Sequence, residues 1–231
     1  SILQNKTYVD IVLGPDSYRK IIDLIKERKK EKSRFIDTKL SRYEVYSDIL
    51  PSRNEGINAW IPIMRGCNKF CTFCIVPFTR GRERSRSLDS ILNEAIDAVD
   101  NGYKEITLLG QNVNSYKFEN IGFHDLLESI AQIKDLKRIR YTSPHPQDMT
   151  EEVISVMNDY ENICNYVHLP LQSGSNSILK KMNRTYSREK FIDLYFLIKD
   201  KLKNVGVSTD IIVGFPGETD QDFQDTISLM E

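Results

Sequence analysis

The sequence has few cysteines, no excess of charge of either sign and no long apolar run. Its 231 residues include four cysteines, and 32 Lys and Arg stand against 33 Asp and Glu, which gives a formal net charge of −1. So few cysteines exclude a disulfide scaffold. The charge balance excludes a bulk polycation and an acidic disordered tail, but not a local nucleic-acid patch. No apolar run approaches the ~20 residues that cross a bilayer, and residues 1–6 lack a signal-peptide core, so we expect a cytoplasmic protein without a membrane partner.

The N-terminal quarter of the chain shows too little patterning to form a domain of its own. One strand over 7–13 and one helix over 16–29 are predicted, and a single strand with a single helix cannot bury a core. We therefore expect residues 1–31 to be the last βα unit of an N-terminal domain whose earlier part lies outside this chain. Residues 32–56 are predicted to be a basic linker, because 26–42 carry eight basic and three acidic residues without an apolar pattern. Steering of an anionic partner is the alternative.

Residues 57–231 are treated as one core domain. Strand patterns alternate with helix patterns throughout it. Strands are expected over 57–64, 105–109, 138–142, 166–169 and 207–213, and helices over 88–101, 123–134, 151–158, 176–182, 188–201 and from 219 onward. Alternating βα units imply parallel strands with right-handed crossovers. Because polar loops follow the strands, a partial (β/α) barrel is favoured over a doubly wound sheet. Pro62 places the first strand at an edge or a bulge, and at least one further strand is expected beyond residue 231.

Three of the four cysteines, Cys67, Cys71 and Cys74, fall in the loop after the first predicted strand. Thiolates spaced four and three residues apart can converge on one metal site. Structural zinc sites are closed by four ligands, and iron–sulfur clusters usually take four cysteines. Three ligands would leave one metal position open for chemistry. The alternative is a zinc site that His145, His168 or Cys164 completes.

The motif Cys67-Asn68-Lys69-Phe70-Cys71-Thr72-Phe73-Cys74 resembles that of the radical S-adenosylmethionine (SAM) superfamily. Four longer stretches are similar to the methylthiotransferases within it, and in particular to the branch that modifies N6-dimethylallyladenosine in transfer RNA: 65–86, 108–114, 168–175 and 210–219. The resemblance is strong over about residues 57–231 and weak over 7–30. It implies an α/β fold, a partial (β/α) barrel of the radical SAM type.

The resemblance also implies a [4Fe–4S] cluster and SAM as cofactors. In this family the open iron of the cluster binds SAM, and electron transfer generates a 5′-deoxyadenosyl radical. The reaction adds a methylthio group to C2 of N6-(dimethylallyl)adenosine at position 37, in the tRNA anticodon loop, where a single-stranded base can enter a pocket. A second [4Fe–4S] cluster is expected only in an N-terminal domain, which this chain is expected to lack. The chain is also expected to lack the C-terminal RNA-binding TRAM domain of the family. We therefore expect this chain to bind the first cluster and cleave SAM, but to lack full activity.

The resemblance assigns site residues by position. The cluster ligands are Cys67, Cys71 and Cys74, and the residues expected to contact SAM are Phe73, Gln111, Asn112, Ser143, Gln172, Ser173 and Asp210. The alternatives are a core phenylalanine for Phe73, a polar turn for Gln111 and Asn112, and a plain strand residue for Asp210. His145 is either a pocket or a turn residue, and His168 is expected to be structural.

Arginines alternate with other residues just beyond the cysteine loop. Arg80, Arg82, Arg84 and Arg86, with Arg65, are predicted to contact RNA phosphates, because such contacts position nucleic acid without reading its sequence. Ion pairs with Glu83 and neighbouring carboxylates are the alternative. The further partner expected is a reductase such as flavodoxin or ferredoxin, and the protein is expected to be a monomer.

Other functions remain open from the sequence. Within the class, the rivals are methylthiotransferases for threonylcarbamoyladenosine in tRNA or for an aspartate of a ribosomal protein. Outside it, the rivals are a non-catalytic RNA-binding module with zinc at the cysteines and an inactive structural fragment. A four-iron cluster is brown and absorbs near ~400 nm, whereas zinc is colourless, so colour separates the first class from the zinc module.

Overall fold

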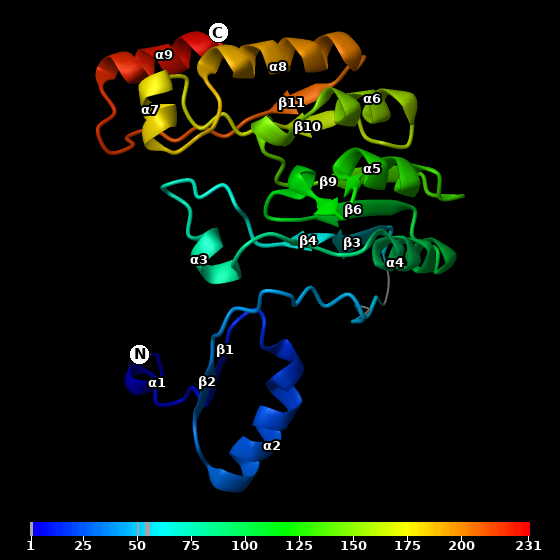
Figure 1. Ribbon diagram of the computed structural model, residues 1–231, viewed down its shortest axis with the longest axis vertical. Coiled ribbons are helices and arrows are strands. Elements are labelled where there is room, and N and C mark those ends of the chain that lie inside the picture. Colours follow the sequence, from blue (N-terminus) through cyan, green and yellow to red (C-terminus); the bar gives the residue numbers. More distant parts are fainter. Residues whose placement is uncertain (1, 50, 54–55) are drawn as a thin grey trace.

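The N-terminal unit forms one end of the molecule (Figure 1). The structure, a computed structural model, describes residues 2–49, 51–53 and 56–231. The elements of this unit are α1 (Ile2–Asn5), β1 (Ile11–Leu13), the 3-10 helix η1 (Tyr18–Lys20), α2 (Ile21–Glu31) and β2 (Phe35–Asp37). Strands β1 and β2 pair in parallel, with Ile11 opposite Phe35.

The predicted linker is wrong in its first part. Helix α2 ends at Glu31, beyond the predicted end at residue 29, and Lys32 adopts a left-handed φ of 53° that terminates it. Residues 35–37 then form β2, three residues long, against β1. So short a strand carries no readable alternation, and its pairing depends on the backbone of β1 more than on its own side chains.

The rest of the chain is a partial barrel of parallel strands with helices outside (Figure 1). Its strands are β3 (Asn58–Pro62), β6 (Glu105–Leu109), β9 (Arg138–Tyr141), β10 (Tyr166–His168) and β11 (Gly206–Ser208). The first three pair in parallel in the order β3-β6-β9, and β10 pairs in parallel with β11. A single parallel bridge, Ile139 to Ile163, links the two groups. The predicted part-barrel is confirmed, with β3 at an edge as Pro62 requires.

The helices match the predicted series closely, while several short elements were not predicted. The helices are α4 (Leu88–Asp100), α5 (Phe123–Ala131), α6 (Glu151–Asp159), α7 (Asn176–Lys181), α8 (Arg188–Lys201) and α9 (Asp220–Met230). The unpredicted elements are β4 (Met64–Arg65), α3 (Val76–Arg80), β5 (Arg84–Ser85), η2 (Val113–Ser115), β7 (Lys117–Phe118), β8 (Ile121–Gly122) and η3 (Pro146–Asp148). In the described part of the chain, no helix is long and apolar enough to span a membrane.

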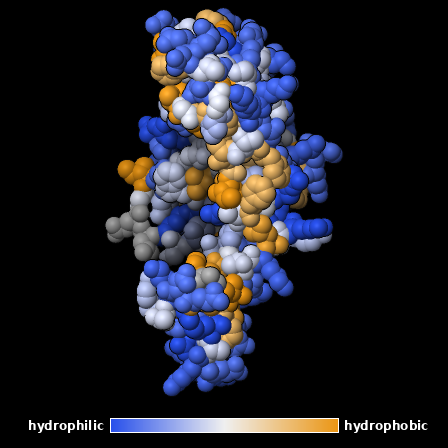
Figure 2. All heavy atoms as spheres, turned by 90° about the vertical axis from the view of Figure 1, so that its left-hand side faces the viewer, coloured by the Kyte–Doolittle hydropathy of each residue, from blue (hydrophilic) through white to orange (hydrophobic). Residues whose placement is uncertain are grey.

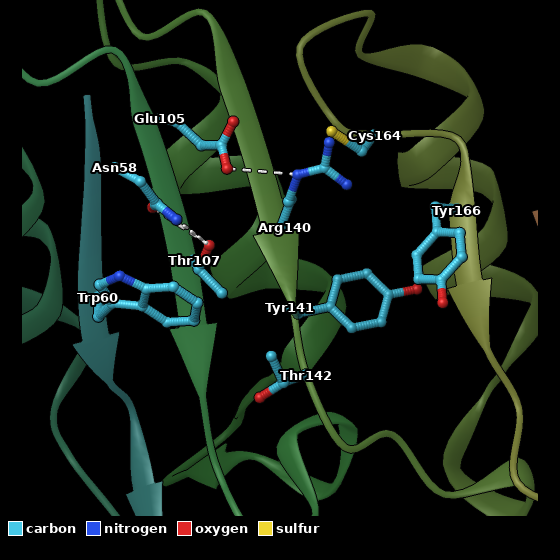
Figure 3. Close-up of a pocket in the computed structure, with 9 residues that line it drawn as sticks. All are labelled: Asn58, Trp60, Glu105, Thr107, Arg140, Tyr141, Thr142, Cys164 and Tyr166. Atoms are coloured by element: carbon cyan, nitrogen blue, oxygen red, sulfur yellow. Dashed lines mark hydrogen bonds and ion pairs between the residues drawn. The ribbon is translucent and has the colours of Figure 1, made fainter. Parts of the chain in front are cut away.

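The two faces of the sheet differ in polarity. On the outer face Ile61, Ile106, Leu108 and Ile139 are fully buried and belong to one hydrophobic core with residues of the covering helices. On the inner face lie polar and charged side chains: Asn58, Glu105, Thr107 and Arg140, together with Trp60 (Figure 3). Strand alternation places neighbouring residues on opposite faces. The inside of the barrel is therefore lined for binding rather than for packing.

Candidate functional site

The cysteine loop is held at its base by the antiparallel ribbon of β4 and β5, in which Arg65 pairs with Arg84. Gly66 follows β4 with a φ of +78°, and a Cβ there would lie 2.1 Å from the carbonyl oxygen of Arg82, so only glycine fits. The Gly66 amide donates to Oε1 of Gln111, 2.6 Å away. The loop that carries the cysteines is therefore anchored to the end of β6.

Two of the three cysteines are buried. Cys67 and Cys71 are each 9% exposed, and Cys74 is half-buried. Nη1 of Arg184 donates to Sγ of Cys71 at 3.3 Å. Burial raises the pKa of the Cys67 thiol, a cost that metal coordination overcomes because a bound metal deprotonates the thiol.

A polar network joins the cysteine loop to the ends of β6 and β9. Asn112 is 2% exposed, and its Nδ2 donates to Oδ2 of Asp148 at 2.8 Å. Nζ of Lys69 donates to Oδ1 of the same aspartate at 2.8 Å. The side-chain carbonyl Oδ1 of Asn112 is buried without a hydrogen-bond partner. An orphaned acceptor beside the cysteine loop points to a missing donor, because buried polar groups are normally satisfied.

The donor set fits a cluster better than a single ion. Among the described residues, no three His, Cys, Asp or Glu side chains stand close enough together to hold one metal ion. A [4Fe–4S] cluster binds each thiolate at a different iron, so its ligands lie farther apart than those of one tetrahedral ion. Three thiolates on one loop are the kind of ligand that such clusters take, and two of the sulfurs accept hydrogen bonds from the Lys69 amide and from Arg184. The zinc alternative gains no support from these positions.

The histidines proposed as a fourth zinc ligand are occupied elsewhere. Nδ1 of His145 accepts from the Gln147 amide at 3.2 Å, and its ring packs edge-on against Tyr186. Nδ1 of His168 lies 2.8 Å from Oγ of Ser208, and Nε2 lies 3.2 Å from Oδ2 of Asp210. The Tyr166 hydroxyl lies 2.6 Å from Oγ of Ser208, so a row of hydrogen bonds runs from Tyr166 through Ser208 and His168 to Asp210. His145 is thus a turn residue, whereas His168 belongs to a hydrogen-bonded row on β10 and β11.

The residues predicted to contact SAM do not all meet. Gln111 and Asn112 lie beside the cysteine loop, and Phe73 is exposed, which contradicts the core alternative for it. Ser143 is also exposed, with a φ of 55°. Ser173 is instead fully buried, and its hydroxyl interacts with the Ser175 amide and with Thr226 of α9. Its side chain therefore serves the packing of α9.

Gln172 and Asp210 meet at the carboxyl ends of β10 and β11. The Gln172 amide donates to the Asp210 carbonyl at 2.9 Å, and a parallel bridge joins Gln172 to Ile211. The Asp210 carboxylate is exposed on the row with His168. Both residues therefore lie beyond the carboxyl ends of β10 and β11.

The predicted arginine patch separates into two kinds of residue. Arg84 and Arg86 are buried, and they pair with Asp16 at 3.1 Å and with Glu94 at 2.6 Å. That geometry matches the ion-pair alternative, and a buried paired guanidinium is not available to phosphate. Arg65 is likewise buried and lies 3.3 Å from Asp16. Arg80 and Arg82 are exposed, so these two alone remain candidates for RNA contact.

Burial of His145 makes the stability of the fold depend on pH. Desolvation, with Arg184 and Lys69 nearby, lowers the pKa of His145 to about 2. The unfolded chain, with a histidine pKa near ~6.5, binds more protons than the native chain below that pH, so stability falls as the pH drops below ~6.5. We expect the free energy of unfolding to lose up to about 1.4 kcal/mol per pH unit from this group. Urea unfolding between pH 7 and pH 5 measures it.

The matched variants are His145→Asn, which keeps an acceptor for the Gln147 amide, and His124→Asn at a partly exposed position. The first should flatten the pH dependence between pH 7 and pH 5, and the second should leave it as in the parent. An unchanged slope in His145→Asn would mean that His145 is not the group responsible.

Comparisons with known proteins agree on the superfamily. The family model described as "Radical SAM superfamily" matches residues 61–230. The proteins named tRNA-2-methylthio-N(6)-dimethylallyladenosine synthase from Porphyromonas gingivalis and Bacteroides fragilis are 47% and 49% identical to the chain, over 97% of its length. The protein of that name from Prosthecochloris aestuarii is 45% identical over 100% of it. The chain spans about half the length of these relatives, 50% to 52%.

Solved structures share the fold at low sequence identity. The cobalamin-dependent radical SAM enzyme OxsB matches with a TM-score of 0.60 and 16% identity, over 74% of this chain and 26% of its own. The radical SAM methyltransferase TsrM from Kitasatospora setae, solved with cobalamin and a [4Fe-4S] cluster bound, also has a TM-score of 0.60, with 18% identity over 74% of this chain and 34% of its own.

Proposed function

This chain belongs to the radical SAM superfamily, and on that premise we propose that it is the core of a transferase that adds a methylthio group to C2 of N6-(dimethylallyl)adenosine in tRNA. The observation that carries the proposal is the three-cysteine loop on a barrel whose inner face is polar. The names of the relatives supply the substrate, since proteins 45% to 49% identical to the chain are synthases of the methylthio derivative of that nucleoside.

Radical SAM enzymes use a [4Fe–4S] cluster and SAM, and Cys67, Cys71 and Cys74 would hold the cluster here. A cluster bound there would supply the one-electron reduction that cleaves SAM. Arg184 and the Lys69 amide donate hydrogen bonds to two of the sulfurs. Such bonds stabilise the thiolates and raise the reduction potential of a cluster.

The orphaned Oδ1 of Asn112 is the chain's best acceptor for the amino group of SAM. It is buried beside the cysteine loop, and its amide is oriented by the hydrogen bond from Nδ2 to Asp148. Gln111 would act indirectly, because its side chain accepts a hydrogen bond from the Gly66 amide and so positions the cysteine loop. The exposed Phe73, with Ser143, Gln172 and Asp210 at other strand ends, would bind the remaining parts of the cofactor.

The proposed partners follow the same reasoning. The substrate is the anticodon loop, with the modified adenosine at position 37, and the electron donor is a reductase of the flavodoxin or ferredoxin kind. We also propose that residues 1–31 are the end of a preceding domain, that residues 57–231 are the catalytic core and that the chain is a monomer.

Anaerobic reconstitution with iron, sulfide and SAM tests the proposed chemistry. With dithionite as reductant, we expect the chain to release 5′-deoxyadenosine without forming a methylthio product. The Asn112→Leu variant, which removes the orphaned acceptor, should keep its cluster but require more SAM for the same rate. Absence of 5′-deoxyadenosine from a preparation that holds a full cluster would contradict the proposal.

Removal of Arg80 and Arg82 should weaken RNA binding at every loop sequence. Each phosphate contact that is lost lowers the slope of log K against log salt by about 1, so the Arg80→Ala, Arg82→Ala double variant should lower it by about 2. Binding to an anticodon stem-loop is measured at several salt concentrations. The control is Lys201→Ala with Lys203→Ala, exposed lysines at the opposite end of the barrel, which should leave the slope unchanged. Equal effects of the two double variants would place the RNA elsewhere.

A further inference from the structure

The only tryptophan of the sequence, Trp60, is unusually placed. It lies in the middle of β3 on the inner face of the barrel and is 54% exposed, although its neighbours Ala59 and Ile61 on the outer face are fully buried. In Figure 3 its indole ring extends from β3 toward Thr107 of β6. A large aromatic side chain exposed inside a polar recess is a common anchor for ligands.

Trp60 borders two hollows of different character. On one side is a polar hollow of about 240 Å³, where Asn58 and Thr107 hydrogen-bond to each other and Arg140 pairs with Glu105. On the other side is a larger hollow of about 620 Å³. The indole therefore borders both a hollow lined by polar side chains and a larger one in which apolar residues stand beside Arg65, Arg86 and Glu94.

The larger hollow is closed on one side by residues that shortly precede β3 in the sequence. Its walls include Val45, Ile49 and Pro51 from the N-terminal side, and Pro62 and Leu109 from the ends of β3 and β6. Its lining also reaches Gln111 and Arg65, next to the cysteine loop, and the exposed Arg80. Figure 2 views the molecule from the side of α3, where hydrophobic residues gather between the N-terminal unit and the upper helices.

The size and chemistry of the larger hollow fit one part of the proposed substrate. Ligand pockets commonly measure ~300–1,000 Å³ and combine apolar walls with a few polar groups. N6-(dimethylallyl)adenosine joins a flat, polar base to a branched apolar chain. A base stacked on an indole, with its chain among aliphatic residues, would satisfy both parts. Arg80 at the rim would meet the RNA backbone.

We propose that the hollow bordered by Trp60, Val45, Ile49 and Pro51 binds the dimethylallyl-bearing base of the target nucleoside. Trp60 stacks on the adenine, and Val45, Ile49 and Pro51 cover the dimethylallyl chain. This inference rests on the proposed function and deepens it, because it names the residues that select an apolar N6 substituent over a charged one.

Intrinsic fluorescence reports directly on this site, because Trp60 is the single tryptophan. The chain, at fixed cluster content, is titrated with N6-dimethylallyladenosine, adenosine, N6-threonylcarbamoyladenosine and S-adenosylhomocysteine. We expect quenching by the dimethylallyl nucleoside, with the other three binding at least roughly tenfold more weakly, since they lack the apolar chain. Equal or stronger quenching by any of the three, or no quenching by any nucleoside, would overturn the proposal.

Two variants separate the wall of the hollow from general effects. Ile49→Asn should remove most of the preference for the dimethylallyl nucleoside over adenosine, whereas Ile36→Asn should keep it. The two isoleucines are 49% and 53% exposed, and only Ile49 lines the hollow. Trp60→Phe, checked for folding by circular dichroism, should weaken binding in equilibrium dialysis. Retention of the full preference in Ile49→Asn would contradict the proposal.

The test does not depend on catalysis. A chain that binds the dimethylallyl nucleoside selectively but releases no 5′-deoxyadenosine would support the binding site and contradict the proposed chemistry. Conversely, a chain that cleaves SAM but shows no selective quenching would overturn the binding site alone.

Discussion

Replacement of Cys67, Cys71 or Cys74 by serine, one at a time, is expected to abolish the brown iron–sulfur chromophore. Each thiolate would hold a separate iron, and with three protein ligands no other cysteine stands by to replace a lost one. We expect absorbance near ~400 nm and bound iron to fall to background after anaerobic reconstitution, whereas the parent chain retains both.

The matched control is Cys164→Ser, which changes the fourth cysteine. Cys164 lines the polar hollow at the end of the barrel away from the cysteine loop. This variant should keep the colour and iron content of the parent. Loss of the chromophore in Cys164→Ser, or its survival in any of the other three variants, would mean that the ligand set is different.

Neutralising Asp16 should destabilise the whole chain. Its carboxylate is fully buried between two arginines, 3.3 Å from Arg65 and 3.1 Å from Arg84, and it accepts from the Ser41 amide at 2.8 Å. In Asp16→Asn both guanidinium groups would stay buried without a countercharge. Removal of one partner from a buried ion pair costs about 3–5 kcal/mol, and we expect a loss of that size in urea unfolding.

The same substitution should loosen the cysteine loop. Arg65 and Arg84 face each other in the β4–β5 ribbon from which the loop extends, so Asp16 fixes the base of the loop from the N-terminal unit. We expect Asp16→Asn to retain less iron at a temperature where it is still folded. The control is Asp23→Asn, a surface residue 4.0 Å from Lys26, which should change stability by less than ~0.5 kcal/mol. Equal stability of the two variants would contradict this role.

The regular elements of the barrel were predictable because burial imposes a period on the sequence. Helix α8 begins and ends where its apolar spacing indicated, and so does β6. A strand was predicted over 57–64, and within β3 Ala59 and Ile61 are buried on one face, whereas Ile57, at the start of the predicted range, lies outside β3 and is 72% exposed. Periodicity thus gives the buried face of an element more reliably than its ends.

The fate of individual polar residues depended on partners far away in the sequence. Arg84 is paired because Asp16 reaches it from 68 residues earlier. Ser173 is buried because Thr226 of α9 covers it, 53 residues later. Neither partner can be identified by local spacing. The cysteine motif could be recognised from the sequence because its three cysteines, at positions 67, 71 and 74, lie close together in the chain.

The same limit applies to the larger hollow and to the network around Asn112. Lys69 reaches Asp148 across 79 residues of sequence, and the apolar wall over Trp60 comes from a segment predicted to be a linker. In the structure Trp60 lies on the inner face of β3, and what lies opposite it depends on the tertiary structure. The sequence therefore indicates candidate cluster ligands, but not the surfaces that surround them.

Metal analysis of the anaerobically reconstituted chain, together with its absorption spectrum, tests the central claim most directly. We predict about four iron and about four sulfide per chain, with absorbance near ~400 nm that disappears when the cluster is destroyed by acid. A colourless chain that instead binds one zinc ion tetrahedrally, through the three cysteines and a fourth protein ligand, would contradict the assignment and the radical chemistry that depends on it.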